Sequence, residues 1–376
     1  MFLEKLTVNG LGGDTAGIDV DFNKDLNILT GKNGSGKTTA LKLLWYIISG
    51  NIEHAIEEIP FVQVRVVTNN YTITINRAAR PTPEIVLAVN GKESRFEQVF
   101  DQDGDPTNDP VEAANMAVKE FGASVFFPTF RRIEGGFSIR SSSAYRIASS
   151  GRAVRSASSL EDALQELSRR LSVGNHIFVA SISTVDIVQL LMRQYTDMSE
   201  RSNTLQQKTS QEIIDQIKNY KQEKSAPWAD DPEKVLDTIR SMIEQLDGQR
   251  EAILAPLTAV RVLAERLFQH AGIRLGTRLS FGDAANAVNS DSLSAGEKQM
   301  LSFICYNAFY QNSVIFIDEP ELSLHVDWQR QLFSIMQSQG TANQFIVATH
   351  SPFIYGKFPD REIMLNRDRG DALDGL

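Results

Sequence analysis

The fold is decided by the stretch from residue 26 to residue 39, which runs Leu26-Asn27-Ile28-Leu29-Thr30-Gly31-Lys32-Asn33-Gly34-Ser35-Gly36-Lys37-Thr38-Thr39. It begins with a short apolar run typical of a buried strand and then passes through three closely spaced glycines. A helical pattern follows, with apolar residues three and four apart until Gly50 stops it. The eight residues Gly31–Thr38 match GxxxxGK[ST], a phosphate-binding loop that requires this strand before it and this helix after it.

Each part of this loop has a chemical purpose. The glycines let backbone N–H groups turn toward an anion, and the helix N-terminus adds positive potential. Lys37 is expected to reach the β- and γ-phosphates as a catalytic residue, and the Thr38 hydroxyl to coordinate Mg²⁺. A glycine turn that merely joins strand to helix is the alternative, which the Lys-Thr pair and both flanks disfavour. The predicted contacts to ATP are Gly31, Asn33, Gly34, Ser35, Gly36, Lys37, Thr38 and Thr39.

A second motif ends in two carboxylates. The run Ser313-Val314-Ile315-Phe316-Ile317-Asp318-Glu319 has the form of a buried strand that ends in acids. We expect Asp318 to hold the magnesium ion and its water shell, and Glu319 to orient and polarise the attacking water as a general base. An apolar strand that simply ends in solvated acids is the alternative, and the phosphate-binding loop elsewhere in the chain disfavours it.

Two further segments have more than one interpretation. In Leu293-Ser294-Ala295-Gly296-Glu297-Lys298-Gln299, the Ser294 hydroxyl and the Gly296 backbone suit a second anion site at a helix N-terminus. Ser294 and Glu297 equally suit a helix cap, and the spacing alone does not choose. His350 follows the apolar run 345–348, where it can donate to a γ-phosphate or serve as a structural histidine.

The rest of the chain predicts an α/β unit with an insertion. Short alternating runs predict strands at 3–8, 18–22, 61–67, 71–75, 85–89, 124–128 and 176–180, of which those at 61–67, 71–75 and 85–89 are expected to form an antiparallel meander. Helices are expected near 111–121 and 160–171. Two strands are expected at 273–275 and 278–280. Long helical patterns over 184–223 and 233–269, separated by Pro227 and Trp228, predict a helical hairpin that resembles a short coiled coil and bends at Pro256. The predicted domains are 1–180 and 271–376, the two halves of the α/β unit, and 181–270, the hairpin.

Composition limits the partners. The chain has 376 residues, of which 42% are apolar and 23% charged, with a net charge of −9, so it is neither disordered nor collagen-like. The single cysteine, Cys305, forms no intramolecular disulfide, and neither a signal peptide nor a membrane helix is evident, which predicts a cytoplasmic protein with no membrane partner. Nucleic acid would need a local basic patch. The one basic stretch, 131–159, holds six arginines, of which Arg131 and Arg132 are expected to contact phosphate, nucleic acid or only Glu134.

Together the four motifs resemble the ATP-binding-cassette (ABC) ATPase superfamily. They correspond to its Walker A loop, its signature at 293–299, its Walker B strand at 314–319 and its switch histidine, His350. Two segments resemble the SMC, RecF and OLD branch more than they resemble transporters. They are Asp318-Glu319-Pro320-Glu321-Leu322-Ser323-Leu324-His325 and Ala348-Thr349-His350-Ser351-Pro352. Within that branch the chain is similar to the stand-alone ATPases of the PARIS and Septu anti-phage systems.

The resemblance implies a head-to-tail homodimer with two shared sites, or a higher-order assembly of such dimers. Ser294, Ala295, Gly296 and Glu297 would then contact the ATP held by the partner subunit, and hydrolysis would be slow and switch-like. It further implies a sensor of bacterial immunity that holds or releases a separate effector, a nuclease or toxin, in response to a phage-encoded trigger. Because 26 residues follow His350 in this sequence, we expect no nuclease domain there and a separate effector instead.

Several features depart from the transporter pattern. His325 stands where transporters carry the aspartate of the D-loop, and the segment Phe126–Arg132 takes the place of a glutamine-containing Q-loop. A transporter subunit is therefore disfavoured. A DNA repair ATPase of RecF type remains the alternative function, with the basic stretch as its contact to duplex DNA. Trp228, at the tip of the hairpin, is expected either to anchor a partner or to fold back onto the hairpin.

Overall fold

The computed structural model describes residues 1–13, 17–77, 83–101, 107–129, 132–133, 160–223, 232–267 and 293–365. The chain divides into two compact units. The first comprises Met1–Ser183 together with Leu293–Leu376, and the second is Thr184–Ser292. Among the described residues, no helix combines the length and the apolar character needed to cross a bilayer. The predicted boundary at residue 270 and the predicted strands at 273–275 and 278–280 lie outside the described residues.

A six-stranded parallel sheet forms the centre of the first unit, in the order β10-β8-β12-β13-β3-β14. Nearly all residues of its four inner strands are buried, as expected of a parallel sheet that is covered on both faces. This is why the stretches before the phosphate-binding loop and before Asp318 are continuously apolar. The strands are β3 (Leu26–Thr30), β8 (Ser124–Phe127), β10 (His176–Phe178), β12 (Val314–Asp318), β13 (Gln344–Ala348) and β14 (Glu362–Met364).

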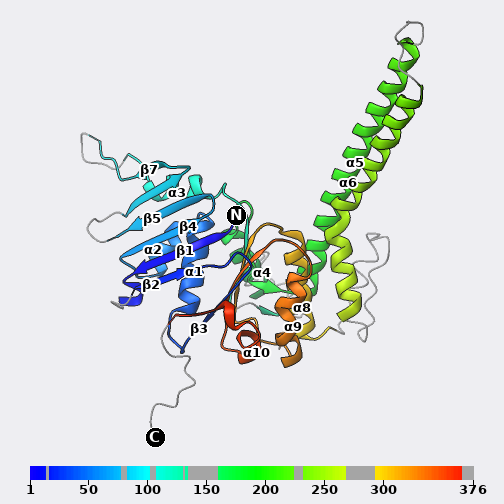
Figure 1. Ribbon diagram of the computed structural model, residues 1–376. Coiled ribbons are helices and arrows are strands. Elements are labelled where there is room, and N and C mark those ends of the chain that lie inside the picture. Colours follow the sequence, from blue (N-terminus) through cyan, green and yellow to red (C-terminus); the bar gives the residue numbers. More distant parts are fainter. Residues whose placement is uncertain are drawn as a thin grey trace, which may run out of the picture. The chain divides into compact units, whose positions relative to one another are not determined.

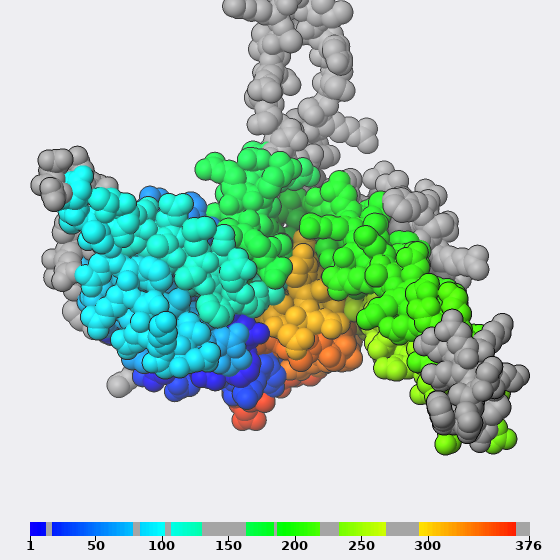
Figure 2. All heavy atoms as spheres, turned by 90° about the horizontal axis from the view of Figure 1, so that it is seen from above, coloured from blue at the N-terminus to red at the C-terminus, as the bar shows by residue number. Residues whose placement is uncertain are grey.

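A second, antiparallel sheet has the order β2-β1-β4-β5-β6-β7, and Figure 2 shows its blue-to-cyan residues as one continuous surface. The predicted meander is confirmed in β4, β5 and β6, where buried and outward residues alternate. β7 was not predicted, because its sequence, Lys92–Phe96, is mostly charged and gives no apolar alternation. The strands are β1 (Leu3–Asn9), β2 (Ile18–Asp21), β4 (Gln63–Thr68), β5 (Tyr71–Asn76), β6 (Glu84–Val89) and β7 (Lys92–Phe96).

Helix α1 (Lys37–Ile48) belongs to the core that both sheets share. The sequence predicted one apolar face, but Leu43 and Ile47 are as completely buried as Leu41 and Leu44. The helix is therefore covered on nearly all sides. The ring of Trp45 stacks on Phe126 of β8, with 5.5 Å between the ring centroids.

The first unit contains several further helices and short strands. Helix α3 begins with Pro110 and is capped by Asp109, whose carboxylate accepts the Val111 N–H at 2.8 Å. The basic stretch is described only at the backbone of β9. The predictions for Arg131, for the side chain of Arg132 and for residues 134–159 therefore lie outside what the structure describes. The elements are η1 (Leu11–Gly13), α2 (Ile52–Glu58), α3 (Pro110–Val118), β9 (Arg132–Ile133), α4 (Leu160–Leu171), β11 (Ser181–Ile182), α8 (Ala295–Phe309), α9 (Val326–Gln337), α10 (Pro352–Tyr355) and η3 (Pro359–Arg361).

The second unit is a helical hairpin of α5 (Thr184–Glu223) and α6 (Pro232–Leu267), the green and yellow pair of helices in Figure 1. Both predicted helices are confirmed, with 40 and 36 residues. Buried or half-buried residues recur at intervals of three and four along α6, and the fully buried ones are Leu257, Val260 and Ala264. Pro256 lies within α6 without ending the helix. Trp228 lies outside the described residues.

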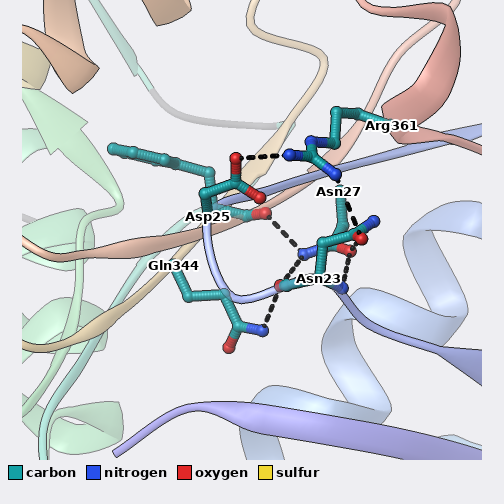
Figure 3. A network of polar contacts seen from close by, with 6 residues as sticks. Asn23, Asp25, Asn27, Gln344 and Arg361 are labelled. Carbon is teal, nitrogen blue, oxygen red and sulfur yellow. Dashed lines mark hydrogen bonds and ion pairs between the residues drawn. The ribbon is translucent and has the colours of Figure 1, made fainter.

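A polar network fixes the amino ends of β3 and β13 (Figure 3). Buried Asn27 donates to the carbonyl of Asn23 at 2.8 Å, and its own side-chain oxygen accepts the Asn23 N–H. Gln344 donates to the same Asn23 carbonyl and exchanges two further bonds with the backbone of Leu3 in β1. Arg361 contacts both Asn23 and Asp25. The network therefore joins the two sheets at the strand ends opposite to the phosphate-binding loop.

Candidate functional site

The phosphate-binding loop leads from β3 directly into α1. Gly34 and Gly36 have left-handed backbones, with φ of 82° and 86°, which glycine adopts without steric cost. The Ser35 N–H donates to the Lys32 carbonyl at 3.1 Å, and Gly36 is the N-cap residue of α1. The free N–H groups and the dipole of a helix N-terminus favour an anion at this position.

Lys37 is a buried cation beside this loop. Its side chain donates to the carbonyls of Gly31 and Lys32 at 2.8 and 3.1 Å, and the residue is 6% exposed. Burial lowers the pKa of Lys37, while the nearby Asp318, Glu319 and Glu321 raise it. The two hydrogen-bond acceptors of Lys37 are neutral carbonyls, so a phosphate would replace them with a charged acceptor.

An unsatisfied hydroxyl supports the same ligand. Among the described residues, the Ser35 Oγ is a buried polar atom without a hydrogen-bond partner. Buried polar atoms are rarely left unpaired, so such an atom in a glycine loop points to a bound acceptor or water. The loop therefore fits a nucleotide triphosphate. Asn33 is exposed at the turn, and Thr39 is half-buried in the first turn of α1.

Asp318 ends β12 and lies between two hydroxyl groups. Its Oδ1 accepts a hydrogen bond from the Thr38 Oγ1 at 3.1 Å, and its Oδ2 accepts one from Thr129, two residues after β8. The aspartate is 1% exposed. Carboxylate and hydroxyl oxygens are the donors that Mg²⁺ prefers, and with a nucleotide bound they would complete its oxygen shell. The predicted metal residues Thr38 and Asp318 are therefore adjacent and chemically suited to magnesium.

Glu319, the predicted general base, has a strained backbone. Its φ is 48°, a left-handed value that costs a non-glycine residue free energy and is often found at functional sites. Its N–H donates to the Ala348 carbonyl at the end of β13, at 2.8 Å. Burial is the largest cause that raises the pKa of Glu319, followed by the charges of Asp318 and Glu321, while His350 and Lys37 lower it. A raised pKa suits a group that must accept a proton.

His350 is placed by a carboxylate that the sequence did not single out. The two oxygens of Glu321 accept the Thr349 hydroxyl and the His350 N–H, each at 2.8 Å. Gln329 of α9 adds a second connection, because it accepts the Ser351 hydroxyl and donates to the Leu324 carbonyl. The chain after β12 is thereby tied to the chain after β13, with the exposed His350 beside Glu319.

The segment 294–297 forms the first turn of α8. Ser294 is its N-cap, with a complete capping box in which the Glu297 N–H donates to Ser294 and the Ser294 N–H donates to Glu297, at 3.3 and 2.7 Å. Gly296 is required for packing, because a Cβ there would lie 2.4 Å from the Ser323 carbonyl oxygen. The cap interpretation of the sequence is thus realised. The predicted contact of these residues with a nucleotide on a partner remains a prediction.

The other sequence predictions have mixed outcomes. His325 is exposed and caps α9, accepting the Asp327 N–H at 3.4 Å. Thr129 and Glu321 were not predicted as site residues, although both follow the ends of buried strands. Gln299 was predicted as part of the segment 293–299 but was given no role of its own. Its fully buried side chain donates to the Pro320 carbonyl at 2.9 Å. Position after a strand is the only signal by which the sequence could have indicated Thr129 and Glu321.

Comparison with known proteins identifies relatives of this fold. Residues 26–355 match the family described as "AAA domain, putative AbiEii toxin, Type IV TA system". No curated protein matches the chain. Among solved structures, the chain is similar to an Smc head domain with an extended coiled coil, bound to the C-terminal domain of ScpA, from Pyrococcus furiosus. The identity is 13%, the TM-score 0.38, and the match covers 95% of this chain and 91% of that one.

Two further structures are similar. An SmcHead bound to the C-winged helix domain of ScpA shares 12% identity, with a TM-score of 0.42 and coverage of 95% of this chain and 92% of that one. An Smc head domain with a coiled coil and joint from Pyrococcus yayanosii shares 11% identity, with a TM-score of 0.38 and coverage of 95% and 93%.

Proposed function

The chain belongs to the AAA-domain family whose description names the AbiEii toxin and a Type IV TA system, and from this premise we propose that it binds and hydrolyses MgATP as a slow switch. The observation that carries the proposal is the buried Lys37, whose ammonium group donates hydrogen bonds to two neutral carbonyls of a phosphate-binding loop. Asp318 and Glu319, at the end of the neighbouring β12, supply the acids that such a reaction needs.

Each residue has a defined task in this proposal. Lys37 transfers its hydrogen bonds from the loop carbonyls to the β- and γ-phosphates, and the N-terminus of α1 supports the same charge. Glu319 orients the attacking water and accepts its proton, and His350 donates to the γ-phosphate. A bound magnesium ion supplies charge neutralisation for the phosphates, and Thr38 and Asp318 would hold it.

We further propose that the site is completed by a second copy of the chain. Ser294 is exposed at the N-terminus of α8, where it is accessible to a nucleotide on a partner subunit. A site that is complete only in a closed dimer turns over slowly and reports on assembly, which suits a switch. In this proposal the ATP state holds or releases a separate effector of an anti-phage system, a nuclease or toxin, in response to a phage-encoded trigger.

The chemistry is tested with Lys37→Ala. We expect this change to lower kcat/KM for ATP by at least ~100-fold, because the phosphates lose their positive partner. Lys42→Ala is the matched control, since Lys42 lies on the same helix, α1, and is outside the motif. ATP hydrolysis is measured by phosphate release. Unchanged hydrolysis in Lys37→Ala would refute the nucleotide site.

The biological role is tested by purifying the tagged protein, expressed from its native operon, with and without phage infection. Co-purifying proteins are identified by mass spectrometry and bound nucleic acid by nuclease sensitivity. A stoichiometric nuclease or toxin that is released on infection supports the defence proposal. Bound duplex DNA without a protein partner would contradict it and favour a repair ATPase of RecF type.

A further inference from the structure

The Asp318 carboxylate is held from both sides by hydroxyl groups of different elements. Thr38 comes from the first turn of α1 and donates to Oδ1, whereas Thr129 follows β8 and donates to Oδ2. The contact of Thr38 with Asp318 is expected, because Thr38 belongs to the phosphate-binding loop and both residues are predicted to hold the magnesium ion. Thr129 lies outside the four nucleotide motifs, in the segment Phe126–Arg132 to which the sequence assigned no side-chain role at Thr129, so its contact with the predicted metal ligand needs its own explanation.

The sheet explains how Thr129 reaches this position. Strands β8 and β12 are parallel neighbours, and Ile317 is in register with Phe127. Their carboxyl ends therefore lie side by side, and the residues that follow them share one edge of the sheet. Thr129 is separated from Asp318 by 189 positions in sequence but lies beside it in the fold.

The two hydrogen bonds limit how the Asp318 carboxylate can orient toward a metal ion. A carboxylate can rotate about its side-chain bonds, and magnesium tolerates little deviation from octahedral geometry. Hydrogen bonds to a ligand from residues that do not contact the metal fix the orientation of that ligand, and their loss typically lowers metal affinity 10- to 100-fold. With Thr129 on Oδ2, the other oxygen, Oδ1, stays on the side of Thr38.

We propose that Thr129 is a positioning residue of the MgATP site, whose hydroxyl holds the Asp318 carboxylate in the orientation that accepts the divalent cation. The proposal rests on the proposed function and deepens it, because it assigns magnesium affinity to a residue outside the nucleotide motifs. It makes a separable claim: loss of the hydroxyl weakens the response to Mg²⁺ and leaves the metal-free affinity for nucleotide unchanged.

The test compares Thr129→Val, which has nearly the same shape without the hydroxyl, with Thr129→Ser, which keeps the hydroxyl. Binding of a non-hydrolysable ATP analogue to the full chain is measured over a series of free Mg²⁺ concentrations and again in EDTA. Thermal unfolding of each variant reports on the fold. Thr129→Ala provides the same comparison if Thr129→Val does not fold.

We expect Thr129→Val to raise the Mg²⁺ concentration at half-maximal binding at least ~10-fold, with unchanged binding in EDTA and with Thr129→Ser close to the wild type. An unchanged Mg²⁺ dependence in Thr129→Val would overturn the proposal. Equal losses with and without Mg²⁺, or equal defects in the Val and Ser variants, would also overturn it and indicate a packing role. If the wild type itself binds no analogue in Mg²⁺, the proposed function fails first.

Discussion

At the scale of single residues, the site consists of charged groups that the fold removes from water. Lys37 and Asp318 are almost completely buried, and Glu319 is half-buried. Burial lowers the pKa of Lys37 and raises the pKa of Glu319, so in both residues the charged form is disfavoured. Perturbed groups that cluster in this way are typical of functional sites, because they gain most from a charged ligand or a transferred proton.

Glu319→Gln tests the general base. We expect a decrease in kcat of at least ~100-fold with little change in ATP affinity, because the amide still fills the space but accepts no proton. ATP should remain bound, and closed dimers should accumulate. Single-turnover hydrolysis and size-exclusion chromatography with ATP are the measurements. Glu93→Gln, at an exposed position of β7, is the control. Normal turnover in Glu319→Gln would mean that another group orients the water.

His176 should make the stability of the fold depend on pH. Its Nδ1 lies 2.8 Å from the Ser124 Oγ, and burial lowers its pKa to about 4, although the backbone of Lys119 acts in the opposite direction. Between about pH 6.5 and pH 4 the unfolded chain binds a proton that the folded chain does not, so stability falls as pH falls.

The size of this effect can be measured by urea unfolding. From pH 7 to pH 5 we expect the free energy of unfolding to decrease by about 2 kcal/mol more in the wild type than in His176→Gln, which has no titrating group there. Equal decreases in the two proteins would show that His176 is not the cause.

At the scale of elements, the ends of the parallel strands have different roles. The carboxyl ends of β8, β12 and β13 hold the acids and hydroxyls of the site, as in other open α/β sheets. The amino ends of β3 and β13 carry the network of Asn23, Asn27 and Gln344. Stability and chemistry are therefore located at opposite ends of the same strands.

Gln344→Met tests the structural end. Gln344 is buried and makes three bonds, to the N–H and carbonyl of Leu3 and to the carbonyl of Asn23. Methionine has a similar size but leaves these groups unsatisfied, so we expect the free energy of unfolding to fall by about 2–4 kcal/mol. Gln337→Met, at an exposed position of α9, should change it by less than ~0.5 kcal/mol. Equal values for both variants in urea unfolding would contradict the role of the network.

At the scale of the whole molecule, the first unit is assembled from two distant parts of the sequence. Strands β3, β8 and β10 precede the hairpin, and strands β12, β13 and β14 follow it, yet they form one parallel sheet. In this sheet β13 lies between β3 and β12. Neither part contains a complete site, because Thr38 and Thr129 come from the first and Asp318 from the second.

Complementation tests whether two copies share the site. Ser294→Arg and Lys37→Ala should each abolish hydrolysis, because one blocks the predicted contact with the partner and the other the phosphate-binding loop. An equimolar mixture should recover about one quarter of wild-type activity, since half of randomly formed dimers are mixed and each has one intact site. Melting temperatures of the single variants check that α8 survives the loss of its cap. Activity of either variant alone, or no recovery on mixing, would contradict a shared site.

The sequence by itself determined the local features. The glycine pattern, the Lys-Thr pair and the apolar run before them predicted the loop between β3 and α1, and the structure has that loop. Alternation predicted the meander, and helical patterns predicted both arms of the hairpin, with a three- and four-residue spacing in the second arm. These patterns are visible in sequence because each expresses backbone geometry or burial over neighbouring residues.

Only the tertiary structure decided which distant residues complete the site. Thr129 meets Asp318 across 189 positions, Glu321 meets Thr349 across 28, and Gln344 meets Leu3 across 341. A hydroxyl or an amide after a strand is common, and nothing in its own neighbourhood indicates its partner. Strand order supplies that information, because parallel neighbours bring their ends to one edge whatever their separation in sequence.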